Sequence, residues 1–253
     1  MISCGVDVGL RAQHLCTLDD DLSAAFHPPG SVEDVAAAVR GLGPDVTVGI
    51  DAPGGRSLHL LAEGTRLRAG LGIAPGRYLR ARVCDWQLMR RGLPLYPSPG
   101  AGEEPVGWQA WMGEGYRLFA ALAGLGSYAP VPDPRCEGAA GPDPGRHGRV
   151  FETFPDAAFC ALAGHRPWPK RTAAGREERV MLLRRAGVRG AGLPTRSLHE
   201  LDACAAALVA HRFSTGAAGW VGAPHEGVIV VPVAELRERY APLSRARRPR
   251  SSP

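Results

Sequence analysis

Apolar and polar positions along this chain follow two periods, one typical of strands and one typical of helices. Two short β-branched runs, residues 2–9 and 47–53, each stop at a glycine or proline. Each run carries an aspartate near its end, Asp7 in the first and Asp51 in the second. Runs of this kind are typical of buried strands. We therefore predict two strands that each deliver a carboxylate at the same end.

The segment between these runs predicts a hairpin followed by a helix. Residues 13–18 and 22–26 are two further apolar runs, separated by the acidic triplet Asp19-Asp20-Asp21. Acidic residues between short apolar runs are typical of a turn. Ser31 is a favourable N-cap, and the apolar positions within residues 32–39 recur at helical spacing.

The order strand, strand, strand, helix, strand limits how the first and fourth strands can pair. A right-handed crossover through the helix lays the fourth strand parallel to the first. Asp7 and Asp51 are then expected to be neighbours at one edge of the sheet.

The second half of the chain alternates loops with further regular elements. Helices are predicted at residues 106–125, 156–163, 173–186 and 197–213, and strands at residues 148–155 and 227–232. Residues 54–105 form an insertion rich in arginine, glycine and proline, and residues 126–146 are a Pro/Gly loop. We predict one domain over residues 1–243, without internal repeats, and a disordered basic tail at 244–253.

The charge distribution changes this picture little. The net charge is +5, but the tail contains four arginines and the rest of the chain is nearly neutral. Within the insertion, residues 66–91 hold seven arginines and one acid, Asp85, together with Tyr78 and Trp86. Such a segment is typical either of a nucleic-acid groove or of an arginine-rich surface, and both interpretations stay open.

Cysteine spacing and hydropathy exclude several classes of protein. No two of the six cysteines form a C-x-x-C pair, so we expect buried thiols rather than a zinc site. The longest apolar runs are too short to cross a bilayer, and the N-terminal residues lack the pattern of a signal peptide. A cytoplasmic protein without a membrane partner is the expectation.

Four carboxylates stand out because they lie on separate predicted elements. Asp7, Asp51 and Glu152 lie near the ends of apolar strands, and Asp202 lies near the start of the helix at 197–213. Buried carboxylates are unfavourable unless they are paired, hydrogen-bonded or bound to a cation. Clustered carboxylate oxygens suit Mg²⁺ or Mn²⁺, and two such ions can promote phosphodiester cleavage.

Taken together, several segments of the chain resemble a known family, the domain of unknown function 429 family. The matching segments are Gly5–Gly9, Gly49–Pro53, Arg82–Asp85, Phe151–Pro155, Lys170 with Gly175 and Arg179, Leu201–Ala203 and Gly227–Pro232. They extend over about residues 2–232. The resemblance implies an α/β, ribonuclease-H-like mixed sheet flanked by helices, in which three antiparallel strands are followed by parallel strands. It also implies a nuclease with a metal-binding acidic site at Asp7, Asp51, Glu152 and Asp202.

These observations lead to a hypothesis about roles. Asp7 bridges two cations, Asp51 and Asp202 complete the site, and Glu152 is a further ligand or orients water. Lys170, the one lysine in the chain, neutralises a phosphate oxygen as a point charge.

Three further residues are weaker candidates for substrate contacts. His199 lies one helical turn before Asp202 and can move a proton near neutral pH, or it is a surface histidine at the helix start. Arg82 and Asp85, spaced i and i+3, contact substrate or form a local ion pair that holds the insertion.

Two other classes of function remain compatible with the sequence. An actin-like phosphotransferase or ATPase also begins with Asp-x-Gly, here Asp7 to Gly9, but it needs a second domain. A non-catalytic binding module can retain the same fold. The sequence distinguishes neither DNA from RNA as the partner nor any oligomeric state.

Overall fold

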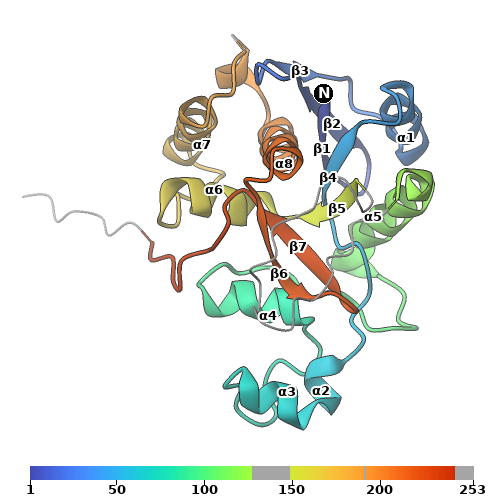
Figure 1. The fold of residues 1–253 in the computed structure, drawn as a ribbon, viewed down its shortest axis with the longest axis vertical. Helices are drawn as coiled ribbons and strands as arrows, with labels where there is room; N and C mark the ends of the chain where they lie inside the picture. Colours follow the sequence, from blue (N-terminus) through green and yellow to red (C-terminus); the bar gives the residue numbers. More distant parts are fainter. Residues whose placement is uncertain (127–148, 191, 243–253) are drawn as a thin grey trace, which may run out of the picture.

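A seven-stranded sheet forms the centre of the described part of the protein (Figure 1). The structure is a computed structural model, and it describes residues 1–126, 149–190 and 192–242. The strands are β1 (Ser3–Val8), β2 (Gln13–Leu18), β3 (Ala24–Phe26), β4 (Thr47–Asp51), β5 (Val150–Thr153), β6 (Gly219–Ala223) and β7 (Gly227–Val231). Their spatial order is β3-β2-β1-β4-β5-β7-β6.

The pairing of the strands confirms the predicted fold class. β1, β2 and β3 are antiparallel, joined in part by the turn at the acidic triplet, and β1, β4, β5 and β7 run parallel. This is the ribonuclease-H-like mixed sheet that the resemblance implies. β6, which pairs antiparallel with β7 at the edge, was not predicted from the sequence.

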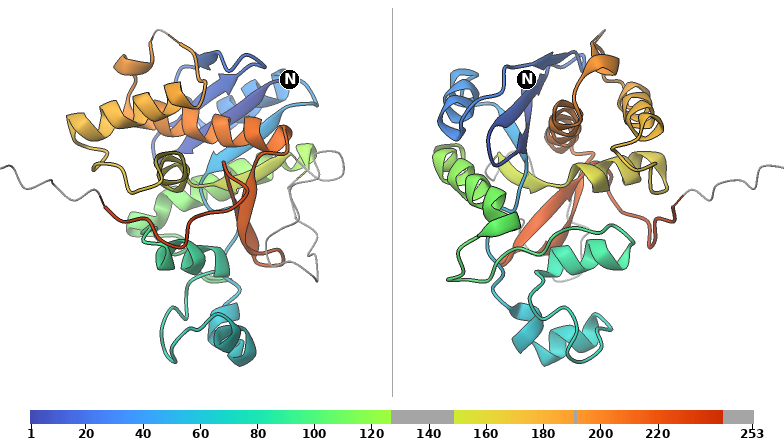
Figure 2. Two further views of the ribbon diagram at one scale, coloured as in Figure 1. Left: turned by 60° about the vertical axis from the view of Figure 1, so that its left-hand side comes forward. Right: turned by 180° about the vertical axis from the view of Figure 1, so that it is seen from behind.

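Helices cover both faces of the sheet. The α-helices are α1 (Val32–Gly41), α2 (Leu60–Glu63), α3 (Thr65–Gly70), α4 (Val83–Arg90), α5 (Ala110–Ala121), α6 (Pro155–Ala163), α7 (Ala173–Arg185) and α8 (Leu198–Ser214). Short 3₁₀ turns lie at Gly107–Gln109, Ala123–Leu125 and Leu193–Thr195. Helices α1 and α5 lie on one face, and α6, α7 and α8 lie on the other (Figure 2). Helices α2 and α3 lie at the far end of the molecule from β1 (Figure 1).

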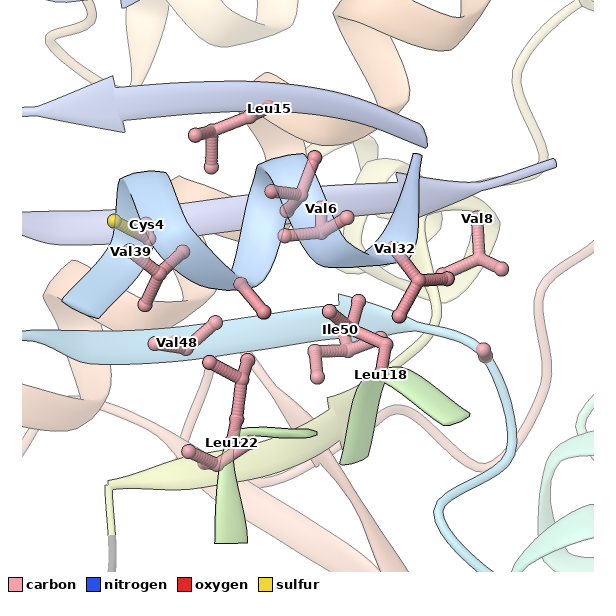
Figure 3. Close-up of a cluster of buried hydrophobic side chains, with 14 of the residues drawn as sticks. Cys4, Val6, Val8, Leu15, Val32, Val39, Val48, Ile50, Leu118 and Leu122 are labelled. Atoms are coloured by element: carbon pink, nitrogen blue, oxygen red, sulfur yellow. The ribbon is translucent and has the colours of Figure 1, made fainter. Parts of the chain in front are cut away.

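Alternation along β1 and β4 separates an apolar face from a face that carries acids. Val6 and Ile50 point into a buried cluster with side chains from α1 and α5 (Figure 3). Because successive side chains of a strand point to opposite faces, Asp7 and Asp51 lie on the other face. That face is covered by α8.

Helix α8 packs unusually close to the sheet because small residues meet at the contact. A Cβ atom added to Gly5 would overlap the backbone carbonyl oxygen of Ala203, and one added to Gly49 would lie 2.8 Å from the Ala206 carbonyl oxygen. The alanine-rich centre of α8 is fully buried there. The glycines of the strands and the alanines of the helix thus bring the backbone of α8 directly onto β1 and β4.

The remaining predictions about the chain have mixed outcomes. The predicted helices in the second half are confirmed, whereas α2, α3 and α4 lie in a segment for which no regular structure was predicted. The five cysteines within the described residues are free and buried, as expected. The described residues do not include Cys136, nearly all of the predicted loop at 126–146, or the predicted tail at 244–253. Among the described helices, none combines the length and apolarity needed to cross a bilayer.

Candidate metal centre

Three of the four predicted acids converge on one point. Asp7, Asp51 and Asp202 each offer a carboxylate oxygen, and these oxygens lie within 4.8 Å of one another. Asp7 and Asp202 are buried and Asp51 is partly exposed. We refer to these three residues as the carboxylate cluster.

Backbone geometry explains why the cluster forms. Asp7 and Asp51 are direct partners in the parallel register of β1 and β4, as predicted. Asp202 reaches them because α8 packs closely on these strands. The start of α8 is set by a capping box in which the Ser197 hydroxyl accepts from Glu200 N and the Glu200 carboxylate accepts from Ser197 N.

Burial and mutual repulsion make the cluster electrostatically unfavourable when all three acids are charged. Burial, and then the carboxylates of Asp7 and Asp202, raise the pKa of Asp51 well above its usual range. Burial raises the pKa of Asp202 to about 6, although the Lys170 ammonium beside it acts in the opposite direction. The Asp202 Oδ1 atom is buried without a hydrogen-bond partner. Buried carboxylates in such surroundings are stabilised when a cation binds among them.

Lys170 and His199 lie directly on the cluster. Lys170 Nζ donates to Asp202 Oδ2 at 3.0 Å, and its pKa is raised because the Asp202 and Asp156 carboxylates outweigh the opposing effect of burial. His199 Nδ1 lies 2.7 Å from Asp7 Oδ2, and this hydrogen bond raises the pKa of His199. The His199 side chain is 62% exposed. It is therefore both at the helix start and in contact with the cluster.

A second histidine at this site, His14, was not predicted from the sequence. It lies opposite Asp7 in the antiparallel register of β1 and β2. Its ring stacks on that of His199, with centroids 5.0 Å apart and an interplanar angle of 12°. Burial, followed by the neighbouring His199, lowers the pKa of His14. His14 could have been identified only from the register of the β1–β2 hairpin, which pairs it with Asp7. Side-chain alternation along a single strand does not give that register.

The structure does not bring Glu152 into the cluster. Its two oxygens accept hydrogen bonds from Arg82 Nη1 and Nη2, both at 2.7 Å, and Oε2 also accepts from Gly54 N. Burial raises the pKa of Glu152, and the Arg82 guanidinium opposes this rise. The expectation that Glu152 is a metal ligand is corrected accordingly, because its oxygens are bound to a buried guanidinium.

Arg82 and Asp85 form a local ion pair, which was the alternative to a role in contacting substrate. Their side chains are only 1% and 0% exposed, and Arg82 Nη2 lies 2.9 Å from Asp85 Oδ1. Glu226 supports the same region, since its Oε2 accepts from Val83 N at the start of α4. Arg82 thus joins α4 to β5 through Asp85 and Glu152.

Several arginines of the basic segment have internal partners. Arg68 is buried and donates to the carbonyl oxygens of Leu61, Arg77 and Ala74. The Arg80 side chain is exposed and pairs with Glu103. The segment therefore uses part of its charge to hold its own loops together, which favours the interpretation as an arginine-rich surface structure.

The donor set of the carboxylate cluster fits a divalent cation. The donors are hard carboxylate oxygens, which Mg²⁺ and Mn²⁺ prefer. Lys170 and a protonated His199 offset part of the negative charge, but the unpartnered Asp202 Oδ1 remains for a ligand. These residues fit the metal that the resemblance implies.

Comparison with known proteins confirms the family resemblance. The model of a family described as "Protein of unknown function (DUF429)" matches residues 132–226, a range that contains Lys170, His199 and Asp202. A solved structure of Thermus thermophilus RuvC is similar, with 16% sequence identity and a TM-score of 0.37, over 85% of this chain and 95% of that chain. A comparison with curated proteins gave no match.

Proposed function

We propose that the protein is a metal-dependent nuclease that hydrolyses phosphodiester bonds of nucleic acid. The observation that carries the proposal is the convergence of Asp7, Asp51 and Asp202 on one point, with a buried and unpartnered oxygen on Asp202. Mg²⁺ or Mn²⁺ bound there would activate water and stabilise negative charge on the phosphate. The three carboxylates would hold the ion, and Glu152, which is bound to Arg82, would not be among its ligands.

His199 is suited to hold and move a proton beside the cluster. A charged carboxylate only accepts hydrogen bonds, so the contact with Asp7 Oδ2 places a proton on His199 Nδ1. In the neutral ring, Nε2 is then an acceptor. Because the side chain is largely exposed, Nε2 can take a proton from water or return one to a leaving oxygen.

Lys170 orients Asp202 and supplies a positive charge at the rim of the cluster. Its ammonium group is bound to Asp202 Oδ2, and its side chain is 42% exposed. An ammonium in this position also attracts a non-bridging phosphate oxygen. Arg82 and Asp85 are not included in the substrate contacts, because they are bound to each other and to Glu152.

Of the two alternative classes, the actin-like phosphotransferase is less compatible with the described residues. These form one sheet with its helices, whereas that class needs a second domain that shares the phosphate site. The non-catalytic module differs from our proposal in activity alone, and the experiment below separates the two.

The test is a cleavage screen with single-stranded, duplex and branched DNA and RNA in Mg²⁺ or Mn²⁺. We expect cleavage by the wild-type protein, and a loss of at least about 100-fold in Asp7→Asn and Asp51→Asn. Asp45→Asn is the matched control, since the Asp45 side chain is 86% exposed and precedes β4 at the opposite end from Asp51. Equal activity in Asp7→Asn would refute the mechanism. Binding of Mn²⁺ by calorimetry without cleavage of any substrate would indicate a non-catalytic module.

A further inference from the structure

A cavity opens beside the carboxylate cluster and shares Asp51 with it. Its volume is about 420 Å³, which lies within the range of roughly 300–1,000 Å³ typical of small-molecule sites. Lys170, which contacts Asp202, also lines this cavity. Any group that occupies the cavity is therefore next to the site where the phosphate would react.

One part of the cavity lining is apolar and aromatic. Leu95, Tyr96, Trp111 and Phe154 all contribute to it. Tyr96 is 66% exposed, and its ring lies 5.1 Å from the ring of Trp108, which is itself 59% exposed. Large aromatic side chains exposed in this way suit stacking against a planar ring. The lining thus favours an occupant with a flat, weakly polar face.

Most of the charges that line the cavity are already paired within the protein, so the body of the cavity, away from Lys170 at its rim, offers a phosphate group little free positive charge. Of its two described cations, Arg82 is bound to Glu152 and Asp85, and Lys170 is bound to Asp202. The lining also contains the carboxylates of Asp51, Glu152 and Asp156, of which Glu152 is bound to Arg82 and Asp156 to Arg179. Carboxylates repel an anion, but they accept hydrogen bonds from N–H groups. The occupant should therefore be uncharged and should carry N–H donors at its edge.

We propose that this cavity receives an unpaired nucleobase of the nucleic-acid substrate. The inference rests on the proposed nuclease function and specifies its substrate class. A nucleobase is planar and uncharged, and adenine, cytosine and guanine carry exocyclic amino groups that can donate to carboxylates. A base inside a duplex cannot reach such a cavity without leaving the stack. The preferred substrate is thus a single strand, or a duplex with an unpaired nucleotide beside the cleaved bond.

Tyr96 provides the most direct test, because its side chain is exposed and its replacement should not disturb folding. Binding of a fluorescein-labelled single-stranded 12-nucleotide DNA is measured by anisotropy in EDTA, where no metal-dependent cleavage occurs. The competing probe is the same backbone with abasic residues, which has the same charge and no bases. Variants are Tyr96→Ala and Tyr96→Phe, and Tyr78→Phe serves as the control on an exposed tyrosine of the insertion.

We expect the wild-type protein to bind the base-containing strand about tenfold more tightly than the abasic strand, since stacking of a base on an aromatic side chain strengthens binding. Tyr96→Ala should lose most of this preference, whereas Tyr96→Phe and Tyr78→Phe should retain it. Equal binding of the two strands by the wild type, or an unchanged preference in Tyr96→Ala, would overturn the inference.

The binding assay and the cleavage screen separate failure of this inference from failure of the proposed function. A base preference that depends on Tyr96, without cleavage in Mg²⁺ or Mn²⁺, leaves the cavity assignment standing and removes the nuclease. Cleavage that depends on Asp7, with equal binding of both strands, leaves the nuclease standing and removes the cavity assignment.

Discussion

Replacing Asp202 by asparagine should stabilise the metal-free protein at neutral pH while removing its response to divalent cations. The pKa of Asp202 is raised from 3.8 to about 6. Between these values the folded protein binds the proton more strongly than the unfolded chain does. Stability from this group is therefore fully present below pH 3.8, and it is lost as the pH rises toward 6.

The magnitude follows from the size of this shift. At about 1.4 kcal/mol per pH unit, a rise from 3.8 to about 6 corresponds to roughly 3 kcal/mol of destabilisation at pH 7.5. Asparagine has the shape of the protonated acid and carries no charge. Asp202→Asn should thus recover about 3 kcal/mol in EDTA, which corresponds to a rise of roughly 1 M in the urea midpoint.

The assay is equilibrium urea unfolding followed by circular dichroism, at pH 7.5 and at pH 4. We expect Asp202→Asn to exceed the wild type at pH 7.5 and to differ little from it at pH 4. Addition of Mg²⁺ or Mn²⁺ at pH 7.5 should raise the wild-type midpoint and leave that of the variant unchanged. Asp45→Asn is the control and should stay within about 0.5 kcal/mol of the wild type. A variant that is no more stable than the wild type in EDTA at pH 7.5 would refute the electrostatic reasoning.

Three further substitutions test contacts that stabilise the sheet and its helices, each by urea or thermal unfolding. Gly5→Ala places a Cβ atom against the backbone of α8 and should cost about 3 kcal/mol or more; a loss below about 1 kcal/mol would contradict the close approach. Arg82→Met leaves Asp85 and Glu152 buried without their cation and should lower the free energy of unfolding by about 3–5 kcal/mol. An unchanged unfolding midpoint would contradict this prediction. Ser197→Ala removes the N-cap of α8 and should cost about 1 kcal/mol, whereas Ser23→Ala, outside any helix cap, should be nearly neutral.

Much of the first half of the fold was predictable because it depends on local signals. The acidic triplet between β2 and β3, the Ser31 cap of α1 and the β-branched run of β4 each specify their element within a few residues. The parallel pairing of β1 and β4 followed from the general handedness of crossovers. That pairing is what makes Asp7 and Asp51 neighbours.

Elements with weak local signals were missed. β6 contains two glycines within five residues, Gly219 and Gly222, and glycine is a poor strand former. It is a strand because its backbone pairs with β7. Helix α4 is only eight residues long and lies among arginines, so its pattern is hard to separate from a loop. Burial of Cys84 and Leu88 in a cluster with β6 and β7 side chains stabilises it.

The sequence by itself determined which acids lie at strand ends and at a helix start, because side-chain alternation and capping depend on neighbouring residues. Only the tertiary structure decided which of those acids meet. Asp202 joins Asp7 and Asp51 because glycines in the strands allow α8 to approach closely. Glu152 is bound instead by Arg82, 70 residues away in the chain. A contact between residues so far apart in the chain depends on how whole elements pack, and the local pattern of apolar and polar residues does not predict it.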